Sequence, residues 1–216
     1  PKYCFVRNGF LNIAVHRDPH TTNDGKTQPY SSARIRTQKR GEWQYGRFEI
    51  RAKMPNGQGI WPAVWMLPTE SKYGGWAAGG EIDIIESRGN AVDETTGALH
   101  FGGAWPRNTY LAHRYKFPAK DAAEDFHVYA LEWTADKIKW FVDGKLCKTR
   151  TKEEWFCETA KENPRAPYDQ PFHLIINLAV DGRFFEKTDQ QADQIAPDAF
   201  PQIFQCDYVR VYQWAD

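Results

Sequence analysis

Three carboxylates lie within six residues, at Glu81, Asp83 and Glu86, in the sequence Glu-Ile-Asp-Ile-Ile-Glu. Side chains alternate between the two faces of a strand, so Glu81 and Asp83 share one face while the intervening isoleucine points into a core. Simple alternation would place Glu86 on the opposite face. One β-bulge between Asp83 and Glu86 would return it, because a bulge adds a residue to one strand only. The segment therefore predicts a bulged strand with three carboxyls on one surface.

Carboxyl groups crowded in this way indicate proton transfer or covalent catalysis. Like charges raise each other's pKa values at a cost in stability, and such clusters are typical of active sites. Retaining glycosidases use two carboxyls about 5–5.5 Å apart, one as nucleophile and one as general acid/base. Glu81 and Glu86 would lie roughly 13 Å apart at Cα, a gap that long side chains and strand curvature can shorten. The charges alone leave one alternative open, which is an exposed strand whose acidic residues merely face water.

The aromatic content offers a second indication, with 9 Trp, 10 Tyr and 13 Phe among 216 residues. Sugar rings stack on tryptophan, so this composition suits a carbohydrate cleft, although an aromatic-rich core would also explain it. Trp61 and Trp65 lie four apart on an expected strand and share a face. We expect them to stack on sugar rings, with core packing as the alternative. Trp76 and Trp105 are further candidates for the same role.

The charge balance narrows the range of ligands. Lys+Arg and Asp+Glu both number 28, which argues against a nucleic-acid partner, because such proteins usually carry a basic excess. No run of 18 apolar residues occurs, so no membrane span is expected. The substrate is expected to be uncharged or mildly charged. The four cysteines (Cys4, Cys147, Cys157 and Cys206) allow three pairings if all are bridged, and free buried thiols are the alternative.

The elements that must position these residues are many short strands. Alternating segments separated by Gly, Pro, Asn and Asp occupy residues 10–15, 32–37, 45–54, 59–67, 81–86, 96–101, 126–133, 137–142, 172–180 and 207–213. Asp143-Gly144 between two such segments is a strong hairpin signal. One short helix is expected over 151–160, and long loops over 106–123 and 184–200. The pattern predicts an antiparallel all-β sandwich, as a single domain over 1–216.

The carboxylate segment resembles the signature of glycoside hydrolase family 16 in its bulged form, E-x-D-x-x-E. The resemblance extends to residues 45–55 and 59–68 upstream, and to 99–102, 129–133, 141–144, 177–180 and 207–212 downstream. Within the family the chain is most similar to laminarinase-like endo-β-1,3-glucanases, because xyloglucan-cleaving relatives typically lack the extra bulge residue. The resemblance implies a jelly-roll β-sandwich of two curved antiparallel sheets with a concave glycan-binding cleft.

By this resemblance, Glu81 is the nucleophile, Glu86 the general acid/base and Asp83 the assisting carboxylate of a retaining hydrolysis that needs no catalytic cofactor. The implied substrate is a laminarin-type β-1,3-glucan or a mixed-linkage β-1,3-1,4-glucan, cut internally by a secreted, extracellular or periplasmic monomer. Two alternatives stay open. One is a non-catalytic β-glucan-recognition protein, and the other an enzyme of the family that acts on agar or carrageenan.

The resemblance also implies roles for residues outside the carboxylate strand. A lone histidine is more often structural, but His100 is expected here to hydrogen-bond the carboxylates or the sugar. Arg34 is a candidate for binding sugar hydroxyls, with an exposed strand arginine as the alternative. A structural calcium ion would take the Asp207 carboxylate and a backbone carbonyl near Gly46, with further oxygen ligands.

Two further expectations concern the ends of the chain. Members of the family usually start some tens of residues earlier, so the opening strand is expected to be truncated here. Cys4 and Cys206 would fall on the first and last strands, which are neighbours in such folds. The resemblance therefore implies a Cys4–Cys206 bridge, with Cys147–Cys157 as its complement.

Overall fold

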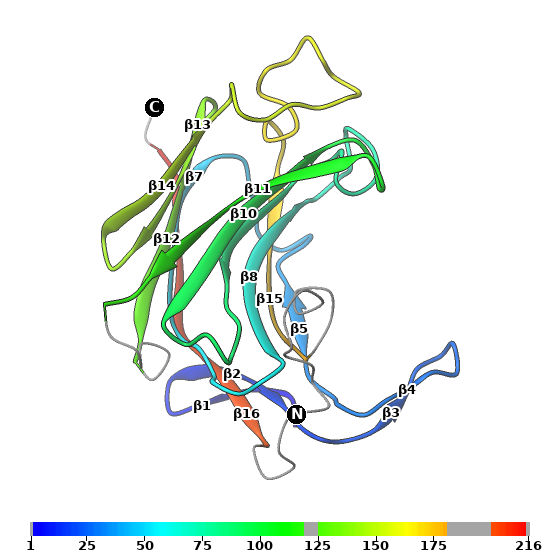
Figure 1. Ribbon diagram of the computed structural model, residues 1–216, viewed down its shortest axis with the longest axis vertical. Coiled ribbons are helices and arrows are strands. Elements are labelled where there is room, and N and C mark those ends of the chain that lie inside the picture. Colours follow the sequence, from blue (N-terminus) through cyan, green and yellow to red (C-terminus); the bar gives the residue numbers. More distant parts are fainter. Residues whose placement is uncertain (1, 119–124, 181–199, 215–216) are drawn as a thin grey trace.

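The computed structural model describes residues 2–118, 125–180 and 200–214. These residues form β-strands joined by turns and contain no helix able to span a membrane. Most strands belong to two antiparallel sheets (Figure 1). The small hairpin of β3 (His20–Thr21) and β4 (Thr27–Gln28) stands apart from both.

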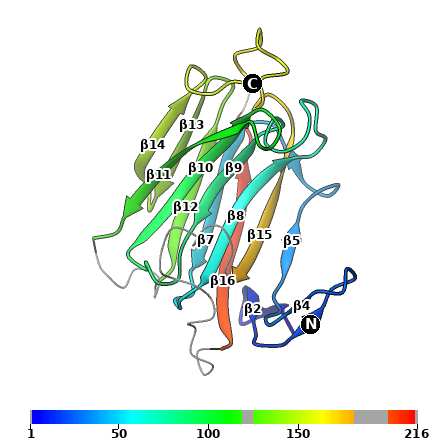
Figure 2. The ribbon, with the colours of Figure 1, turned by 45° about the vertical axis from the view of Figure 1, so that its right-hand side comes forward.

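The two sheets are named after a central strand of each. The β7 sheet contains, in spatial order, β1 (Cys4–Arg7), β2 (Phe10–Val15), β16 (Gln202–Tyr212), β7 (Gly46–Lys53), β12 (His127–Trp133), β13 (Lys137–Val142) and β14 (Lys145–Thr151). The β9 sheet contains β11 (Asn108–Lys116), β10 (Glu94–Gly102), β9 (Glu81–Glu86), β8 (Ile60–Pro68), β15 (Phe172–Val180) and β5 (Arg34–Arg36), and β6 (Glu42–Trp43) pairs with β15. Figure 2 shows β11 to β5 side by side in this order.

The apolar faces of the two sheets pack against each other to form the core. On β7, buried and half-buried residues alternate strictly, and Phe48 and Ile50 are fully buried. On β9, Ile82 and Ile85 are fully buried in the same cluster. Burial of these side chains is the main favourable term in folding. The predicted antiparallel all-β sandwich is confirmed.

A β-bulge at Ile84 determines on which face of the sheet the carboxylates of β9 lie. Asp83 and Ile85 pair with consecutive residues of β8, which leaves Ile84 without a partner there. The register of β9 against β10 shifts at the same place. The bulge predicted from the spacing of Glu81 and Glu86 is therefore present, and it restores the two glutamates to one face of the sheet.

Trp140 on β13 reaches across the core and satisfies the backbone at the bulge. Its Nε1 donates to the carbonyl oxygen of Asp83 at 2.9 Å, and the side chain is 2% exposed. Gly97 on β10 leaves room for the indole, because a Cβ at this position would lie 2.6 Å from Trp140 Nε1. A buried carbonyl without a partner would cost about 1–3 kcal/mol. Gly97 and Trp140 therefore act together to hold the bulge.

Two of the expected elements differ in the structure. β11 occupies half of the segment predicted as a loop over 106–123. Its half-exposed, largely polar side chains give little apolar periodicity, which is why the strand was not predicted. In place of the expected helix over 151–160, β14 ends at Thr151 and isolated turns follow. The expected loop over 184–200 lies outside the described residues except for Phe200. The Asp143-Gly144 hairpin is confirmed, with both residues at positive φ.

All four cysteines are free, so both expected disulfides are wrong. Cys4 pairs with β2 from one side and Cys206 pairs with β2 from the other. Strands two positions apart lie roughly 9–10 Å from each other, which exceeds the Cα separation of about 7 Å that a disulfide can span. Cys157 is buried against the carbonyl of Ala78, while Cys147 lies on β14.

We expect Gly97→Ala to lower the free energy of unfolding by about 1–3 kcal/mol, because the added methyl group displaces the Trp140 indole from the bulge. Thermal melting would measure the loss, and activity should fall with it. Gly75→Ala is the matched control, since a Cβ there meets nothing within 4 Å and its φ is not positive. Equal melting temperatures for the two variants would contradict the role assigned to Gly97.

Candidate active site

Side chains from six strands line up in rows on the face of the β9 sheet that points away from the core. The register gives one row of Arg114, Thr96, Glu86, Ala63, Asn177 and Arg34. The next row is Ala112, Ala98, Asp83, Trp65, Ile175 and Arg36. A third row begins with Tyr110, His100 and Glu81. Sheet pairing thus brings together residues from distant parts of the sequence around the three carboxyls.

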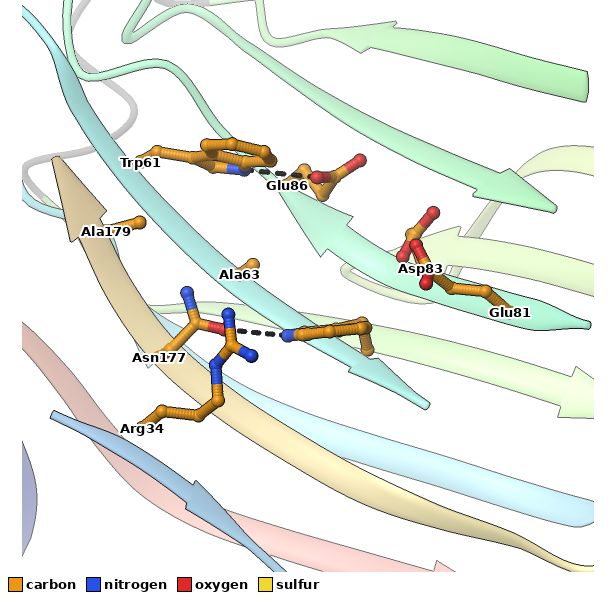
Figure 3. A pocket seen from close by; sticks show the side chains of 9 residues that line it. Arg34, Trp61, Ala63, Glu81, Asp83, Glu86, Asn177 and Ala179 are labelled. Carbon is orange, nitrogen blue, oxygen red and sulfur yellow. Dashed lines mark hydrogen bonds between the residues drawn. The ribbon is translucent and has the colours of Figure 1, made fainter. Parts of the chain in front are cut away.

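A cavity of about 150 Å³ opens over the carboxyls. Its lining is Arg34, Trp61, Ala63, Trp65, Glu81, Asp83, Glu86, Asn177 and Ala179 (Figure 3). A second cavity, of about 340 Å³, shares Arg34 with the first and includes Arg36, Trp76 and His173 in its lining. The predicted residues Arg34, Trp61 and Trp65 therefore do meet the carboxylates in one site.

Glu81 receives a hydrogen bond from a tryptophan in the loop that precedes β9. Trp76 Nε1 donates to Glu81 Oε2 at 2.7 Å, and His100 Nε2 lies 3.8 Å from Glu81 Oε1. The backbone carbonyl of Glu81 accepts from the hydroxyl of Tyr168 at 3.4 Å. Stacking of Trp76 on a sugar stays a prediction; in the structure its indole N–H orients a carboxylate.

Glu86 accepts a hydrogen bond from an indole, and Asp83 lies against an imidazole. Trp61 Nε1 donates to Glu86 Oε1 at 3.0 Å, as Figure 3 shows. Asp83 is 2% exposed, and its Oδ2 lies 3.2 Å from His100 Nε2. His100 therefore contacts the carboxylates as predicted, through Nε2. Indole N–H groups hold the two glutamates, and an imidazole from a third part of the chain contacts Asp83.

Burial dominates the electrostatics of the site. Burial, with the charge of Asp83 next in size, raises the pKa of Glu81 to about 8. Burial, with the charge of Glu81 next, raises the pKa of Glu86 to about 7. The pKa of Asp83 also lies well above its usual range, because of burial and then the charge of Glu86. The three groups therefore retain at least one proton near neutral pH.

Hydrogen bonds also act on the two glutamates. Trp76 donates to Glu81 and Trp61 donates to Glu86, which favours the ionised form of each, and the nearby His100 lowers the pKa of both. Taken singly, the two pKa values would protonate Glu81 first. A sugar ring that excluded water from the Trp76 hydrogen bond would strengthen it and favour the ionised form of Glu81. The site can hold one ionised and one protonated carboxyl side by side.

The remaining predicted binding residues surround this centre. Trp65 Nε1 donates to Asn177 Oδ1 at 2.7 Å, and the guanidinium of Arg34 lies 5.1 Å from the Trp65 ring centroid. Trp105 is 60% exposed and its ring centroid lies 6.4 Å from that of Trp76. Asn177 was missed as a site residue, although a polar residue within the apolar run of β15 was a usable signal.

The calcium ligands expected from the sequence do not come together. Asp207 lies at the register shift next to Arg51, and its Oδ2 is 2.6 Å from Arg51 Nη1. Gly46 lies at the other end of β7, against the backbone of Tyr212. These two residues therefore do not fit a shared calcium site. Within the described part of the chain, the cluster with metal-ligand geometry is Glu81, Asp83 and His100, whose imidazole is not a ligand that calcium prefers.

Similar proteins point to one family. The family model described as Glycosyl hydrolases family 16 matches residues 6–196. The chain is 44% identical over 212 residues to the glucan endo-1,3-beta-glucosidase A1 of Niallia circulans, covering 97% of this chain and 30% of that protein. It is 40% identical over 213 residues to a beta-glucanase of Rhodothermus marinus, covering 98% of this chain and 70% of that protein.

A solved structure agrees with these sequences. The laminarinase catalytic domain of Thermotoga maritima matches with a TM-score of 0.81 and 36% identity, covering 100% of this chain and 82% of that chain. The jelly-roll fold expected from the sequence is thereby confirmed. By its bulged carboxylate strand, its two-sheet fold and these similarities, the chain belongs to glycosyl hydrolases family 16.

Proposed function

We propose that this protein hydrolyses β-1,3-glucan of the laminarin type, or mixed-linkage β-1,3-1,4-glucan, at internal bonds with retention of configuration. The observation that carries the proposal is the set of three carboxyls that β9 directs into one cavity lined in part by tryptophans, with indole donors to Glu81 and Glu86 and the His100 imidazole 3.2 Å from Asp83. Family membership and the similarity to glucan-cleaving relatives support the same substrate class.

In the first step Glu81 is the nucleophile. Its carboxylate attacks the anomeric carbon and forms a glycosyl-enzyme ester, while Glu86 gives its proton to the oxygen of the departing sugar. Trp76 and Trp61 fix these two carboxyls through hydrogen bonds of 2.7 and 3.0 Å. Asp83 and His100 hold Glu81 from the side. Burial, followed by the charge of Glu81, keeps the pKa of Glu86 high enough to hold the proton.

In the second step Glu86 changes from a general acid to a general base. Esterification removes the negative charge of Glu81, so the pKa of Glu86 falls and Glu86 becomes a general base. It takes a proton from water, whose oxygen attacks the anomeric carbon, and Glu81 leaves as a carboxylate. The two inversions give net retention. A polymeric substrate does not cross a membrane, so we place the activity outside the cytoplasm, in a secreted or periplasmic protein.

The intact carboxylates favour hydrolysis over recognition alone. A glucan-recognition protein would need the aromatic floor of the cleft but would not need three desolvated carboxyls, which cost stability. Among the described residues, Arg34 and Arg36 are the arginines that line the two cavities. Two cations beside three acidic groups suit a neutral glucan better than the sulfated chains of carrageenan.

A panel of polysaccharides tests the function. We expect reducing sugar to be released from laminarin and from lichenan or barley β-glucan, and not from agarose. Product analysis by NMR early in the reaction should show the β-anomer at the new reducing end, as retention requires. Binding to laminarin without release of sugar would favour recognition instead. Failure to cut either class of β-glucan would overturn the substrate assignment.

Substitution of the two glutamates tests their roles. We expect Glu81→Gln and Glu86→Gln each to lower kcat by about 10³-fold or more while the chain stays folded. Azide should rescue Glu81→Ala with an α-glycosyl azide and Glu86→Ala with a β-glycosyl azide, since azide replaces the nucleophile in one and attacks the intermediate in the other. The matched control is Glu162→Gln, an exposed carboxylate away from the cavity. Near wild-type turnover in either site variant would contradict the mechanism.

Stability should depend on pH through the buried carboxyls. Burial, and next the charge of Asp83, raises the pKa of Glu81 from 4.5 to about 8 in the folded chain. Between these values the unfolded chain ionises while the folded chain does not, so stability falls as the pH rises. The melting temperature of Glu81→Gln should therefore exceed that of wild type by more at pH 8.5 than at pH 4.5. Each kcal/mol of difference in the free energy of unfolding corresponds to about 2–4 °C.

Calorimetry at the two pH values would measure this difference. Glu153→Gln is the control, because a hydrogen bond from Thr151 lowers the pKa of that exposed carboxylate and makes any effect small and of opposite sign. A Glu81→Gln advantage of equal size at pH 4.5 and pH 8.5 would show that the pKa of Glu81 is not raised.

A further inference from the structure

His100 contacts two of the proposed catalytic carboxyls through one ring nitrogen only. Its Nε2 lies 3.2 Å from Asp83 Oδ2 and 3.8 Å from Glu81 Oε1. Among the described residues, Asp83 Oδ2 has no hydrogen-bond partner apart from this ion-pair contact. The orientation of the imidazole therefore decides whether a donor reaches that oxygen.

The usual way to orient such a histidine is missing here. In most sites the second ring nitrogen of a histidine is hydrogen-bonded to a carboxylate or carbonyl, which fixes both the tautomer and the ring plane. His100 Nδ1 is buried and has no hydrogen-bond partner within the described part of the chain. The hydroxyl of Tyr168 donates to the backbone carbonyl of His100 at 3.0 Å, and this contact holds the main chain but not the ring. Some other contact must fix the imidazole.

Two aromatic rings flank the imidazole of His100. Tyr110, directly across from it on β11, has its ring centroid 5.5 Å away at an interplanar angle of 27°. Trp76 has a ring centroid 5.7 Å away at 40°. Offset stacking at these distances contributes about 0.5–1.5 kcal/mol beyond area burial. Ring packing against Tyr110 and Trp76 can therefore hold the orientation that the free Nδ1 does not.

We propose that Tyr110 is a positioning residue, whose ring holds the His100 imidazole so that Nε2 faces Asp83 and Glu81. Tyr110 is 59% exposed, and its contact with His100 is made through the ring. The proposed role therefore requires the aromatic ring of Tyr110 and not its hydroxyl. This role rests on the proposed function, since it acts through the carboxyls of β9.

Tyr110 gives a cleaner test than Trp76, which also donates directly to Glu81. Tyr110→Ala removes the stacking partner, Tyr110→Phe keeps it, and Tyr110→Leu keeps bulk on the strand without a ring. Thr109→Ala is the matched control, because Thr109 precedes Tyr110 on β11 and points to the other face of the strand.

We expect Tyr110→Ala and Tyr110→Leu to lower kcat on laminarin by about 10- to 100-fold with KM changed less than about twofold, because the bound sugar is unaffected while the carboxyls lose a fixed donor. Tyr110→Phe and Thr109→Ala should match wild type. The profile of kcat/KM against pH should move to higher pH in the Ala and Leu variants. A donor at His100 Nε2 favours the ionised carboxyls, so its loss should raise their pKa values further.

A spectroscopic readout does not depend on catalysis. Nitrogen-15 NMR of the imidazoles, assigned with His100→Gln, should show the Nε2–H tautomer for wild type and Tyr110→Phe and an averaged tautomer for Tyr110→Ala. This result would stand even if the protein did not cut laminarin, so failure of the proposed function is distinguishable. A fixed tautomer in Tyr110→Ala would overturn the proposal. So would a change in KM alone, which would make Tyr110 a sugar platform.

Discussion

Desolvation of three carboxyl groups on one strand is the constraint on which the site depends. Burial raises the pKa of all three, so the charge that chemistry requires has to be stabilised by local donors. The donors are ring N–H groups, and no Lys or Arg of the described residues forms an ion pair with these carboxyls. A full cation at hydrogen-bond distance would lower the carboxyl pKa values by 1–3 units and remove the proton that the acid must carry. Neutral indoles orient the carboxyls without that effect.

The bulge at Ile84 links this surface to the core of the sandwich. It exposes the carbonyl of Asp83 on the inner side of the sheet, where Trp140 of the opposite sheet donates to it. The direction of Glu86 on one face therefore depends on a tryptophan on the other face, and on the absence of a side chain at Gly97. The packing of the two sheets therefore also determines where the carboxyls lie.

Periodicity and composition were enough to predict the bulge and several strands. The parity of Glu81 and Glu86 predicted the bulge, and the strands at 10–15, 137–142 and 172–180 match β2, β13 and β15 to the residue. β11 was missed because an edge strand with one polar face lacks an apolar pattern. The expected disulfides were wrong, and Asp207 and Gly46 lie at opposite ends of β7. Both expectations depend on which residues lie opposite each other across strands, and a single sequence does not contain that information.

The same limit explains why the indole donors were predicted only as platforms for sugar. A tryptophan has an apolar face and one N–H, and only the fold decides which one meets a carboxylate. In Trp76 the N–H bonds Glu81, and 42% of the side chain stays exposed. Its carbonyl is held by the backbone N–H of Trp105 at 2.8 Å, so the loop is anchored. A sugar ring that covers Trp76 would exclude water from the hydrogen bond to Glu81 and strengthen it. On the proposed function, binding of a sugar and stabilisation of the charge on Glu81 are therefore coupled through one side chain.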